Sequence, residues 1–436
     1  MRINRRQFLR GAGSAAVLAS GHVLALVPRR ARAALPVNPV VVLVQLSGGN
    51  DWLNTVIPVN NAAAQRSLYD AYRPSLRVAA SALSGTLLGA DPVNGTTLAL
   101  HPVMTELKAL FDAGHVAVLN GVGVPGAPLS HQGALDAWWA GDPAGFAGTG
   151  WLGRFTDAEL SAADSPALAL GARPAGVFAS LNANALAAPA LVDFALPDDP
   201  LHPDLAARAA AWTALYAADA TDSPLLARVR RAGADVLAKA PLFETVQFSG
   251  WGSALDGASS SLHRDLLQVA SLIRYDETFP DSASGIGLYH VVQPGYDTHA
   301  LQGAADPMAR HPMLLSQLSD ALAKFMADLA ALAVQDRVLV LAYSEFGRRA
   351  RECGSGDSAG TDHGAAGTVL ALGGAVVGGL YGALPDLGAL DANGNPPLRV
   401  DFRRVYATVI DRFLGADHTD FLPGAPFLPL GFLAAP

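Results

Sequence analysis

The chain has a single cysteine, Cys353, and only three lysines among its 436 residues. One cysteine cannot form an intramolecular disulfide, so a buried core must stabilise the fold even in an oxidising compartment. Apolar residues make up 51% of the chain, and a chain of this length can bury a sizeable core. The composition is therefore that of a globular protein with one large domain or two smaller ones.

Basic residues are also scarce, and the deficit is larger than the whole-chain count suggests. The chain has 38 acidic and 30 basic residues, but seven arginines lie in the first 33 residues, which contain no acid. Without that segment, 23 basic residues face 38 acidic ones, a formal charge of −15. Because a phosphate backbone is bound by a basic stripe, we expect no nucleic-acid partner.

The first 33 residues are typical of a twin-arginine export signal. Arg5 and Arg6 precede an uncharged run rich in Gly and Ala, and Ala31 and Ala33 form an A-x-A cleavage pattern. An N-terminal membrane anchor fits less well, because the uncharged run over residues 11–28 is barely of bilayer length and is interrupted by glycines. No later segment has the length of a membrane span. We therefore expect cleavage after Ala33 and a soluble periplasmic or secreted product.

Five short apolar runs end at glycine or polar clusters, and they are continuous rather than alternating. Such runs favour parallel strands that are covered on both faces. Apolar residues recur at three- and four-residue spacing over residues 313–335 and 401–415, which indicates helices between the strands. The apolar runs cover residues 40–46, 115–123, 288–295, 337–347 and 368–374. Strands that alternate with helices predict an α/β fold with a mainly parallel sheet.

The stretch from about residue 156 to residue 280 differs from the rest. It is rich in Ala, Pro, Asp and Leu and contains no strong strand run. We interpret it as a mostly helical cap or insertion. The predicted organisation is thus a signal peptide over residues 1–33 and one domain over residues 34–436 that carries this insertion.

Four polar clusters follow predicted strands directly or lie shortly beyond them, where ligands collect in open α/β sheets. They are SGGND from residue 47, GYDTH from residue 295, SEFGRR from residue 344 and GTDHG from residue 360. Their acids and imidazoles are the ligand types of a site for one or two divalent cations such as Zn²⁺, Mn²⁺ or Ca²⁺. The candidate ligands are Asp51, Asp297, His299, Glu345, Asp362 and His363.

Each cluster also has a purely structural interpretation. Asp51 can cap a helix, Glu345 can pair with Arg348 or Arg349, and the Asp–His pairs can brace their own turns. One cluster alone is weak evidence for a metal site. The occurrence of four clusters at corresponding strand ends favours that site over four unrelated turns.

Six motifs resemble, in order and over nearly the whole chain beyond residue 33, the bacterial exported family called domain of unknown function fifteen-hundred-and-one. They are VQLSGGNDWLN, SHQGALDAWWAG, TGWLGR, GYDTHALQ, SEFGRR and GTDHG. The family is grouped with the alkaline phosphatase and sulfatase superfamily. The resemblance implies a three-layer α/β/α sandwich, and it implies Asp51 and Glu345 as ligands of one metal ion and Asp297, His299 and His363 as ligands of another.

Three positions depart from the superfamily pattern. Phe346 follows Glu345 where a histidine is usual, and Trp52 replaces the glycine expected after GGND. Asp297 and the next histidine are two residues apart rather than four, and Leu301 occupies the expected position. These departures leave a site for two ions, one ion or none open.

The resemblance also implies a nucleophile at a helix N-terminus, where backbone amides receive the anionic group. Ser130 precedes a helical pattern and adjoins His131, so both are candidate catalytic residues. A simple N-cap beside a structural imidazole is an equal alternative. Arg348 is a candidate clamp for a phosphate or sulfate oxygen, or else a partner of Glu345.

The leading functional hypothesis is an exported metal-dependent hydrolase that acts on a small phosphate or sulfate ester. In that hypothesis the metal polarises the ester and activates Ser130 or a water molecule. The rival is a non-catalytic metal-binding or assembly protein that contacts an envelope protein, because genes of the family commonly sit beside another exported family. A structural α/β domain without a metal is the third hypothesis.

Overall fold

The computed structural model describes residues 35–160, 165–171, 175–191, 200–258 and 260–435. The predicted export signal over residues 1–33 lies outside them. In the described part of the chain, nine strands form a central sheet in the order β13-β5-β12-β9-β1-β8-β6-β7, with β14 paired to β5. They are β1 (Val40–Ser47), β5 (Val116–Gly123), β6 (Ala167–Leu170), β7 (Ala185–Ala188), β8 (Leu288–Pro294), β9 (Val338–Tyr343), β12 (Ala366–Leu372), β13 (Gly379–Gly382) and β14 (Val400–Asp401).

Most neighbouring strands of this sheet run parallel. Strand β1 lies between β8 and β9 and is parallel to both, and β6, β7, β13 and β14 also make parallel pairs. Strand β12 is antiparallel to β9 and to β5. It is reversed because residues 344–365 return the chain directly to the strand position beside β9. The predicted α/β fold with a mainly parallel sheet is confirmed.

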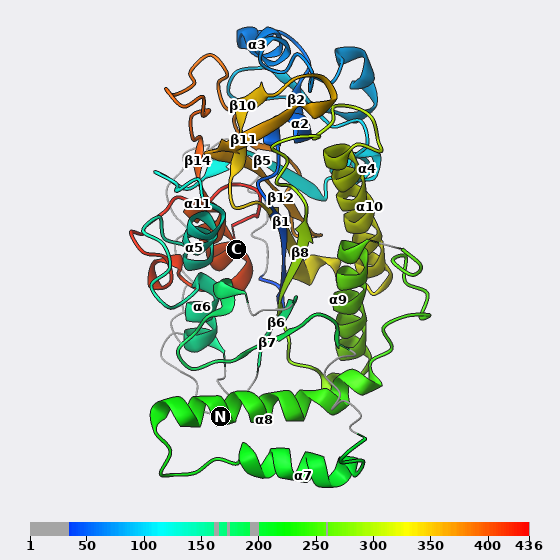
Figure 1. Cartoon of the computed structure of the whole chain (residues 1–436), viewed down its shortest axis with the longest axis vertical. Helices are drawn as coiled ribbons and strands as arrows, with labels where there is room; N and C mark the ends of the chain where they lie inside the picture. Colours follow the sequence, from blue (N-terminus) through cyan, green and yellow to red (C-terminus); the bar gives the residue numbers. More distant parts are fainter. Residues whose placement is uncertain (1–34, 161–164, 172–174, 192–199, 259, 436) are drawn as a thin grey trace, which may run out of the picture. The chain divides into compact units, whose positions relative to one another are not determined.

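The sheet is buried on both faces, as its continuous apolar strands require. Val42 and Val44 of β1 belong to one hydrophobic core, whereas Val41 and Leu43 belong to a second core on the opposite face. Figure 1 shows helices α9 (Ser261–Thr278) and α10 (Arg310–Ala331) on one side of the sheet, and α5 (His131–Ala140), α6 (Trp151–Glu159) and α11 (Phe402–Val409) on the other. Helix α4 (Thr105–Asp112) packs against α10. The result is the predicted three-layer sandwich.

The region between residues 156 and 280 contains two strands in addition to helices. Strands β6 and β7 extend the central sheet, and α7 (Leu205–Leu215) and α8 (Pro224–Thr245) follow them. The strand sequences ALAL and ALAA lack β-branched residues, which explains why the sequence did not mark them. Helix α8 is tied to the loop before β7, where Arg231 donates to the Asn182 carbonyl oxygen at 3.2 Å.

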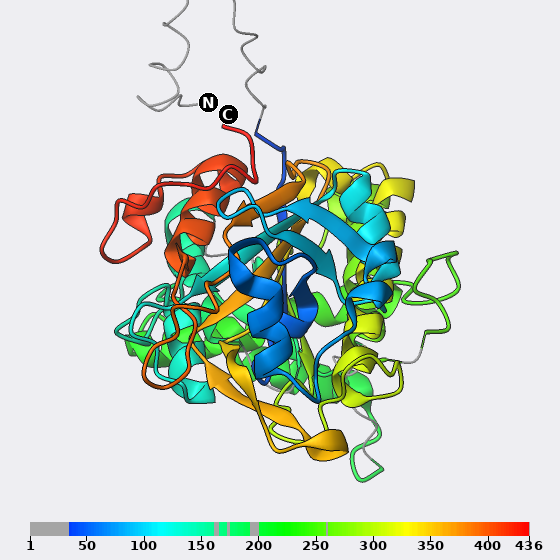
Figure 2. The same ribbon diagram turned by 90° about the horizontal axis from the view of Figure 1, so that it is seen from above.

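Smaller elements gather over the carboxyl ends of β1 and β9. A hairpin of β10 (Gly347–Cys353) and β11 (Gly360–Gly364) follows β9. Helices α2 (Trp52–Thr55) and α3 (Gln65–Tyr72) follow β1 and contact β10, and Figure 2 shows these blue and orange segments from above. Strands β2 (Val56–Pro58), β4 (Thr97–Leu100) and β3 (Leu87–Ala90) form a separate sheet. Among the helices described, none is long and apolar enough to cross a bilayer.

Candidate metal centre

The candidate site lies at one edge of the central sheet. The carboxyl ends of β1, β8 and β9 meet there, because Ser47 lies beside Pro294 and Gln45 beside Tyr343. Strand β5 ends at the same edge, where Gly123 lies beside Ala366 at the start of β12. The segments that follow β5, β8 and β9 therefore converge, although they are far apart in the sequence.

Three imidazoles and one carboxylate meet at this edge. The Nε2 atoms of His299 and His363 are 3.0 Å apart, and they lie 3.1 Å and 3.3 Å from Asp297 Oδ1. His131 Nε2 is 3.5 Å from Asp297 Oδ2. Ligand atoms of a tetrahedral zinc site with bonds of roughly 2.0–2.1 Å lie about 3.3 Å from one another. His131, Asp297 and His363 therefore have ligand atoms close enough to share one ion, and His299 adjoins two of them, Asp297 and His363.

Each of the three imidazoles is held through its other ring nitrogen. The acceptors are Glu345 Oε1 for His131 Nδ1 at 2.9 Å, Asp362 Oδ1 for His299 Nδ1 at 3.1 Å, and the Leu129 carbonyl oxygen for His363 Nδ1 at 2.7 Å. A neutral ring that donates from Nδ1 has a bare lone pair on Nε2. Two such lone pairs face each other across the His299–His363 contact, an unfavourable arrangement that a shared cation relieves. Anchored Nδ1 atoms with converging Nε2 atoms are typical of metal-binding histidines.

Asp297 is kept ionised by Arg348. Partial burial opposes ionisation, but the hydrogen bond and charge of Arg348 outweigh it and lower the pKa of Asp297 to about 2. Arg348 Nη2 lies 2.7 Å from Asp297 Oδ1. The remaining contacts of the Arg348 guanidinium are with the carbonyl oxygens of Gly48, Gly49, Tyr296 and Thr361.

The predicted clamp role of Arg348 therefore needs correction. Its side chain is fully buried, and each of its three guanidinium nitrogens already donates to the protein. This arginine positions Asp297 and is bonded to three backbone segments, so it does not face a ligand.

Glu345 contacts the Nδ1 side of the His131 ring, whereas the candidate ligand atom of that ring is Nε2. Glu345 is 1% exposed, and Oε1 accepts from His131 Nδ1 and, at 2.8 Å, from Gly48 N. Gly48 has φ +122, and a Cβ there would lie 2.2 Å from Asp297 N. The glycine thus permits the close approach that brings β1, Asp297 and Glu345 together. In the structure Glu345 orients a ligand, which differs from the predicted role as a ligand itself.

Asp51 is separated from the cluster by its own ion pair. Its fully buried carboxylate pairs with the equally buried Arg73 at 2.6 Å and 3.0 Å and accepts from Gln302 at 2.5 Å. It also caps α2 through Leu53 N. Burial alone would raise the pKa of Asp51, but the attraction of Arg73 lowers it below its ordinary value. The guanidinium occupies the place where a cation would bind, so we remove Asp51 from the set of ligands.

The resemblance suggested a second ion, but an aromatic ring replaces one of the expected ligands. Phe346 is 3% exposed, and its ring centroid lies 4.3 Å from that of His363 and 5.0 Å from that of His131. The phenyl ring packs where a second histidine would be needed. With Asp51 bound to Arg73, the described residues offer a place for one ion at this edge.

Ser130 lies at the N-cap position of α5, next to His131 in the chain. It is exposed, and its side chain makes no capping hydrogen bond to the helix. A Cβ at Gly133 would lie 2.9 Å from Ser130 Oγ, so the glycine leaves room for the hydroxyl over the first turn. Ser130 thus precedes a candidate ligand in the chain, and its hydroxyl does not cap the helix.

The structure thus changes the predicted roles of several residues. Asp297, His299 and His363 lie together, and His131, predicted as catalytic, lies with them as a further candidate ligand. Asp362 Oδ1 accepts a hydrogen bond from His299 Nδ1, and Asp362 Oδ2 lies 3.6 Å from Arg349 Nη1. Sequence reasoning missed the Leu129 carbonyl group, because a backbone acceptor carries no residue signature.

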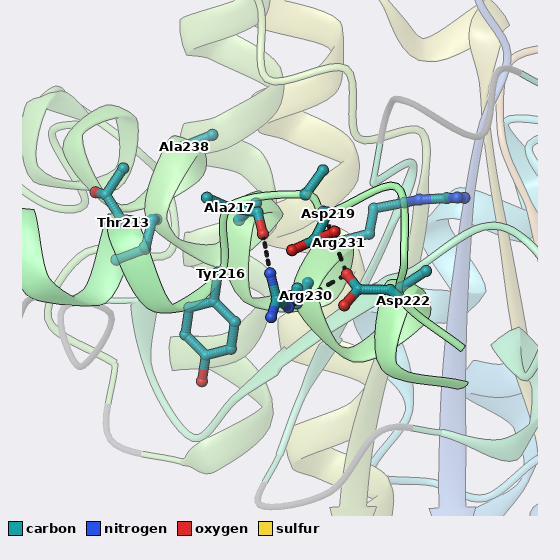
Figure 3. A pocket seen from close by; sticks show the side chains of 12 residues that line it. Thr213, Tyr216, Ala217, Asp219, Asp222, Arg230, Arg231 and Ala238 are labelled. Carbon is teal, nitrogen blue, oxygen red and sulfur yellow. Dashed lines mark hydrogen bonds and ion pairs between the residues drawn. The ribbon is translucent and has the colours of Figure 1, made fainter. Parts of the chain in front are cut away.

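Two cavities in the described part of the chain do not contain these residues. One cavity of about 610 Å³ lies between α7 and α8 (Figure 3). There Arg230 donates to the Ala217 carbonyl oxygen and pairs with Asp222. A second cavity of about 470 Å³ lies beside β10. The candidate centre is a surface cluster, with 40% and 47% of the His131 and His299 side chains exposed.

Comparison with protein families gives a direct match to the second half of the chain. Residues 281–426 match the family described as "Protein of unknown function (DUF1501)". This confirms the resemblance predicted from the motifs over that part of the chain. The matched range includes Asp297, His299, Glu345 and His363. His131 lies before the start of this range. None of the curated proteins compared with the chain matches it in sequence.

Solved structures with a related arrangement of the chain come from several bacterial enzymes. The lipoteichoic acid synthase LtaP from Listeria monocytogenes is 9% identical, with a TM-score of 0.28; the match covers 71% of this chain and 56% of the synthase. A sulfatase from Pseudoalteromonas sp. is 10% identical over 91% of this chain and 73% of its own, with a TM-score of 0.33. A phosphonate monoester hydrolase from Silicibacter pomeroyi is 9% identical over 89% and 77%, with a TM-score of 0.30.

Proposed function

We propose that this protein is an exported metal-dependent hydrolase that acts on a phosphate or sulfate ester. The observation that carries the proposal is the convergence of three Nε2 atoms on Asp297, with every Nδ1 atom held by an acceptor. Three imidazoles and one carboxylate suit Zn²⁺ best among the expected ions, because Ca²⁺ takes oxygen ligands. The chain's own residues thus favour a single zinc ion.

The roles of the residues follow from their positions. An ion bound by His131, Asp297 and His363 would keep one position open and supply a Lewis acid for an ester oxygen. The first-turn N–H groups of α5 favour an anionic group near Ser130, because they lack partners within the helix. Ser130 is the candidate attacking group, and a water molecule is the alternative. Arg348 keeps Asp297 charged, and Glu345 fixes the ring of His131.

The decisive experiment separates binding of the ion from the chemistry. We expect protein purified after expression to contain one equivalent of metal and to hydrolyse an aryl phosphate, aryl sulfate or aryl phosphonate. His363→Ala should lower both metal content and rate, because it removes a ligand. Ser130→Ala should lower the rate and leave the metal content unchanged. If Ser130→Ala keeps the full rate, water rather than Ser130 is the attacking group.

A non-catalytic metal-binding or assembly protein of the cell envelope is the alternative, and one observation favours it. The imidazole of His299 lies 3.0 Å from His363, and as a fourth ligand it would fill a tetrahedral ion as in structural sites, whereas catalytic sites keep one position open. Stoichiometric metal without turnover of the ester panel would support this alternative and contradict the hydrolase proposal. Hydrolysis that depends on His363 would exclude it.

A further inference from the structure

The cavity beside β10 lies close to the candidate centre on the same hairpin. Its walls are Tyr72, Arg351 and residues 388 and 390–394. In the β10–β11 ladder Arg348 lies opposite His363, and Arg351 is three residues further along β10. At the rise of a strand, the Cα atoms of these two residues are at most about 10 Å apart, and the ladder is irregular between Arg348 and Glu352. A ligand bound at the centre can therefore extend into the cavity.

Arg349 connects the two places. Its Nη1 atom is 3.6 Å from Asp362 Oδ2, and the other Asp362 oxygen holds His299. On the cavity side, Ala350 N donates to the Gly394 carbonyl oxygen at 3.4 Å, which fixes the 388–394 loop against β10. The surface from the centre to the cavity is therefore built from one strand and the loop bound to it.

Arg351 carries the available positive charge of this cavity. Its guanidinium lies 4.0 Å from the centroid of the Tyr72 ring, and it is exposed. Among the residues described, no ion pair of Arg351 is found at salt-bridge distance. Stacking fixes the guanidinium plane and leaves its N–H edge open to an anion.

The carboxylates of two neighbouring residues, Asp391 and Glu352, accept hydrogen bonds from groups other than Arg351. Asp391, on the cavity wall, accepts hydrogen bonds from Asn393 N, Asn395 N and Asn395 Nδ2 of its own loop. Glu352, the next residue of β10, accepts from Ser75 N and Leu76 N. Neither carboxylate is used to neutralise Arg351, so the stacked guanidinium can bind an anion of the substrate.

We infer that the substrate is an ester whose alcohol portion carries a second anionic group, and that Arg351 binds this group. The inference rests on the proposed hydrolase function, because the first anionic group is the ester at the metal centre. A planar guanidinium pairs with a carboxylate, phosphate or sulfate through two parallel hydrogen bonds. Arg351 is thus a specificity residue that selects doubly anionic esters.

The test uses two aryl phosphates that differ in one charge. Biphenyl-4-yl phosphate carries only the ester, and its 4′-carboxy analogue adds a carboxylate at the far end of the rigid spacer. With the full chain purified from expressing cells, we expect the carboxylate to lower KM, and the Kd measured by calorimetry, about tenfold, as for a hydrogen bond to a charged group. Arg351→Gln should remove this preference and leave the KM of the parent ester unchanged. Arg404→Gln, which alters an arginine of α11, is the matched control and should keep the preference.

The outcomes distinguish the inference from the function on which it rests. Equal KM and Kd values for both esters in the unaltered protein, together with turnover, would overturn the role of Arg351 and keep the hydrolase. Tighter binding of the analogue that depends on Arg351, without turnover, would support the anion site and contradict the hydrolase. Arg351→Lys keeps the charge but loses the planar guanidinium, so a retained full preference would contradict pairing through two hydrogen bonds.

Discussion

Glu345 shows how a buried side chain can control a site that it does not enter. Its carboxylate fixes which nitrogen of His131 is free to bind an ion. Such outer partners contribute roughly 10–100-fold to metal affinity. We therefore expect Glu345→Gln, which keeps the acceptor oxygen but loses the charge, to weaken zinc binding by about that factor, measured by competition with a chelator. Asp136→Asn on α5, the helix that carries His131, is the control, and an unchanged affinity in Glu345→Gln would refute the role.

A second residue-scale prediction concerns acid stability. His290 of β8 is fully buried beside Gln45, and burial lowers its pKa to about 4. In the unfolded chain an ordinary histidine binds its proton near pH 6.5. The contribution of neutral His290 to the free energy of unfolding is thus complete above about pH 6.5. It is lost as the pH falls toward 4.

The measurement compares urea unfolding at pH 7.5 and pH 5.0. Between these pH values we expect the free energy of unfolding to fall by about 2 kcal/mol more in the unaltered protein than in His290→Gln, whose side chain cannot titrate. His311 is also buried, and its pKa is lowered to about 3, but it is present in both proteins and cancels in the comparison. Identical pH dependence in the two proteins would show that His290 does not contribute.

At the scale of elements, the sequence predicted the central strands well. Residues 40–46, 288–295 and 337–347 cover β1, β8 and β9, because branched apolar runs that end in polar clusters are typical of buried parallel strands. The strands β6 and β7 escaped prediction because alanine has little strand preference. The reversed direction of β12 also escaped, since it depends on where residues 344–365 bring the chain back.

The candidate site was partly predictable for a related reason. Asp297 and His299 follow β8, and His363 lies in β11 of the hairpin after β9, so the strand order of the sheet brings these two segments to the same edge. Asp51 also follows such a strand, but Arg73 reaches it from the end of α3. That pairing depends on tertiary packing, and the sequence around Asp51 gives no sign of it.

The Asp51–Arg73 pair links α2 to β10, because Arg73 also donates to the Ala350 carbonyl oxygen at 2.6 Å. Arg73→Met leaves a buried carboxylate without its partner, so we expect a loss of about 3–5 kcal/mol in the free energy of unfolding, measured with denaturant. Asp51→Asn combined with Arg73→Met should recover part of that loss. The folded double variant should also keep its zinc. Loss of the ion there would mean that Asp51 is a ligand after all.

At the scale of the whole molecule, the first prediction concerns export. We propose that residues 1–33 direct the chain through the twin-arginine route and that the mature protein begins at Ala34. Changing Arg5 and Arg6 together to lysine should leave the precursor in the cytoplasm, detected by cell fractionation and by the mass of the chain. Replacing Arg29 and Arg30 by lysine is a matched control that should not retain the precursor. Normal export of the Arg5/Arg6 variant would contradict the proposal.

The arrangement of the ligands links the identity of the ion to the timing of folding. His131 is bonded to Glu345, 214 positions away, and the four candidate ligands come from three distant segments, so the centre cannot capture an ion before the sheet has assembled. The twin-arginine route carries chains that are already folded. The cytoplasmic supply, rather than that of the destination, would then choose the ion. The identity of the bound ion would then show in which compartment the protein had folded.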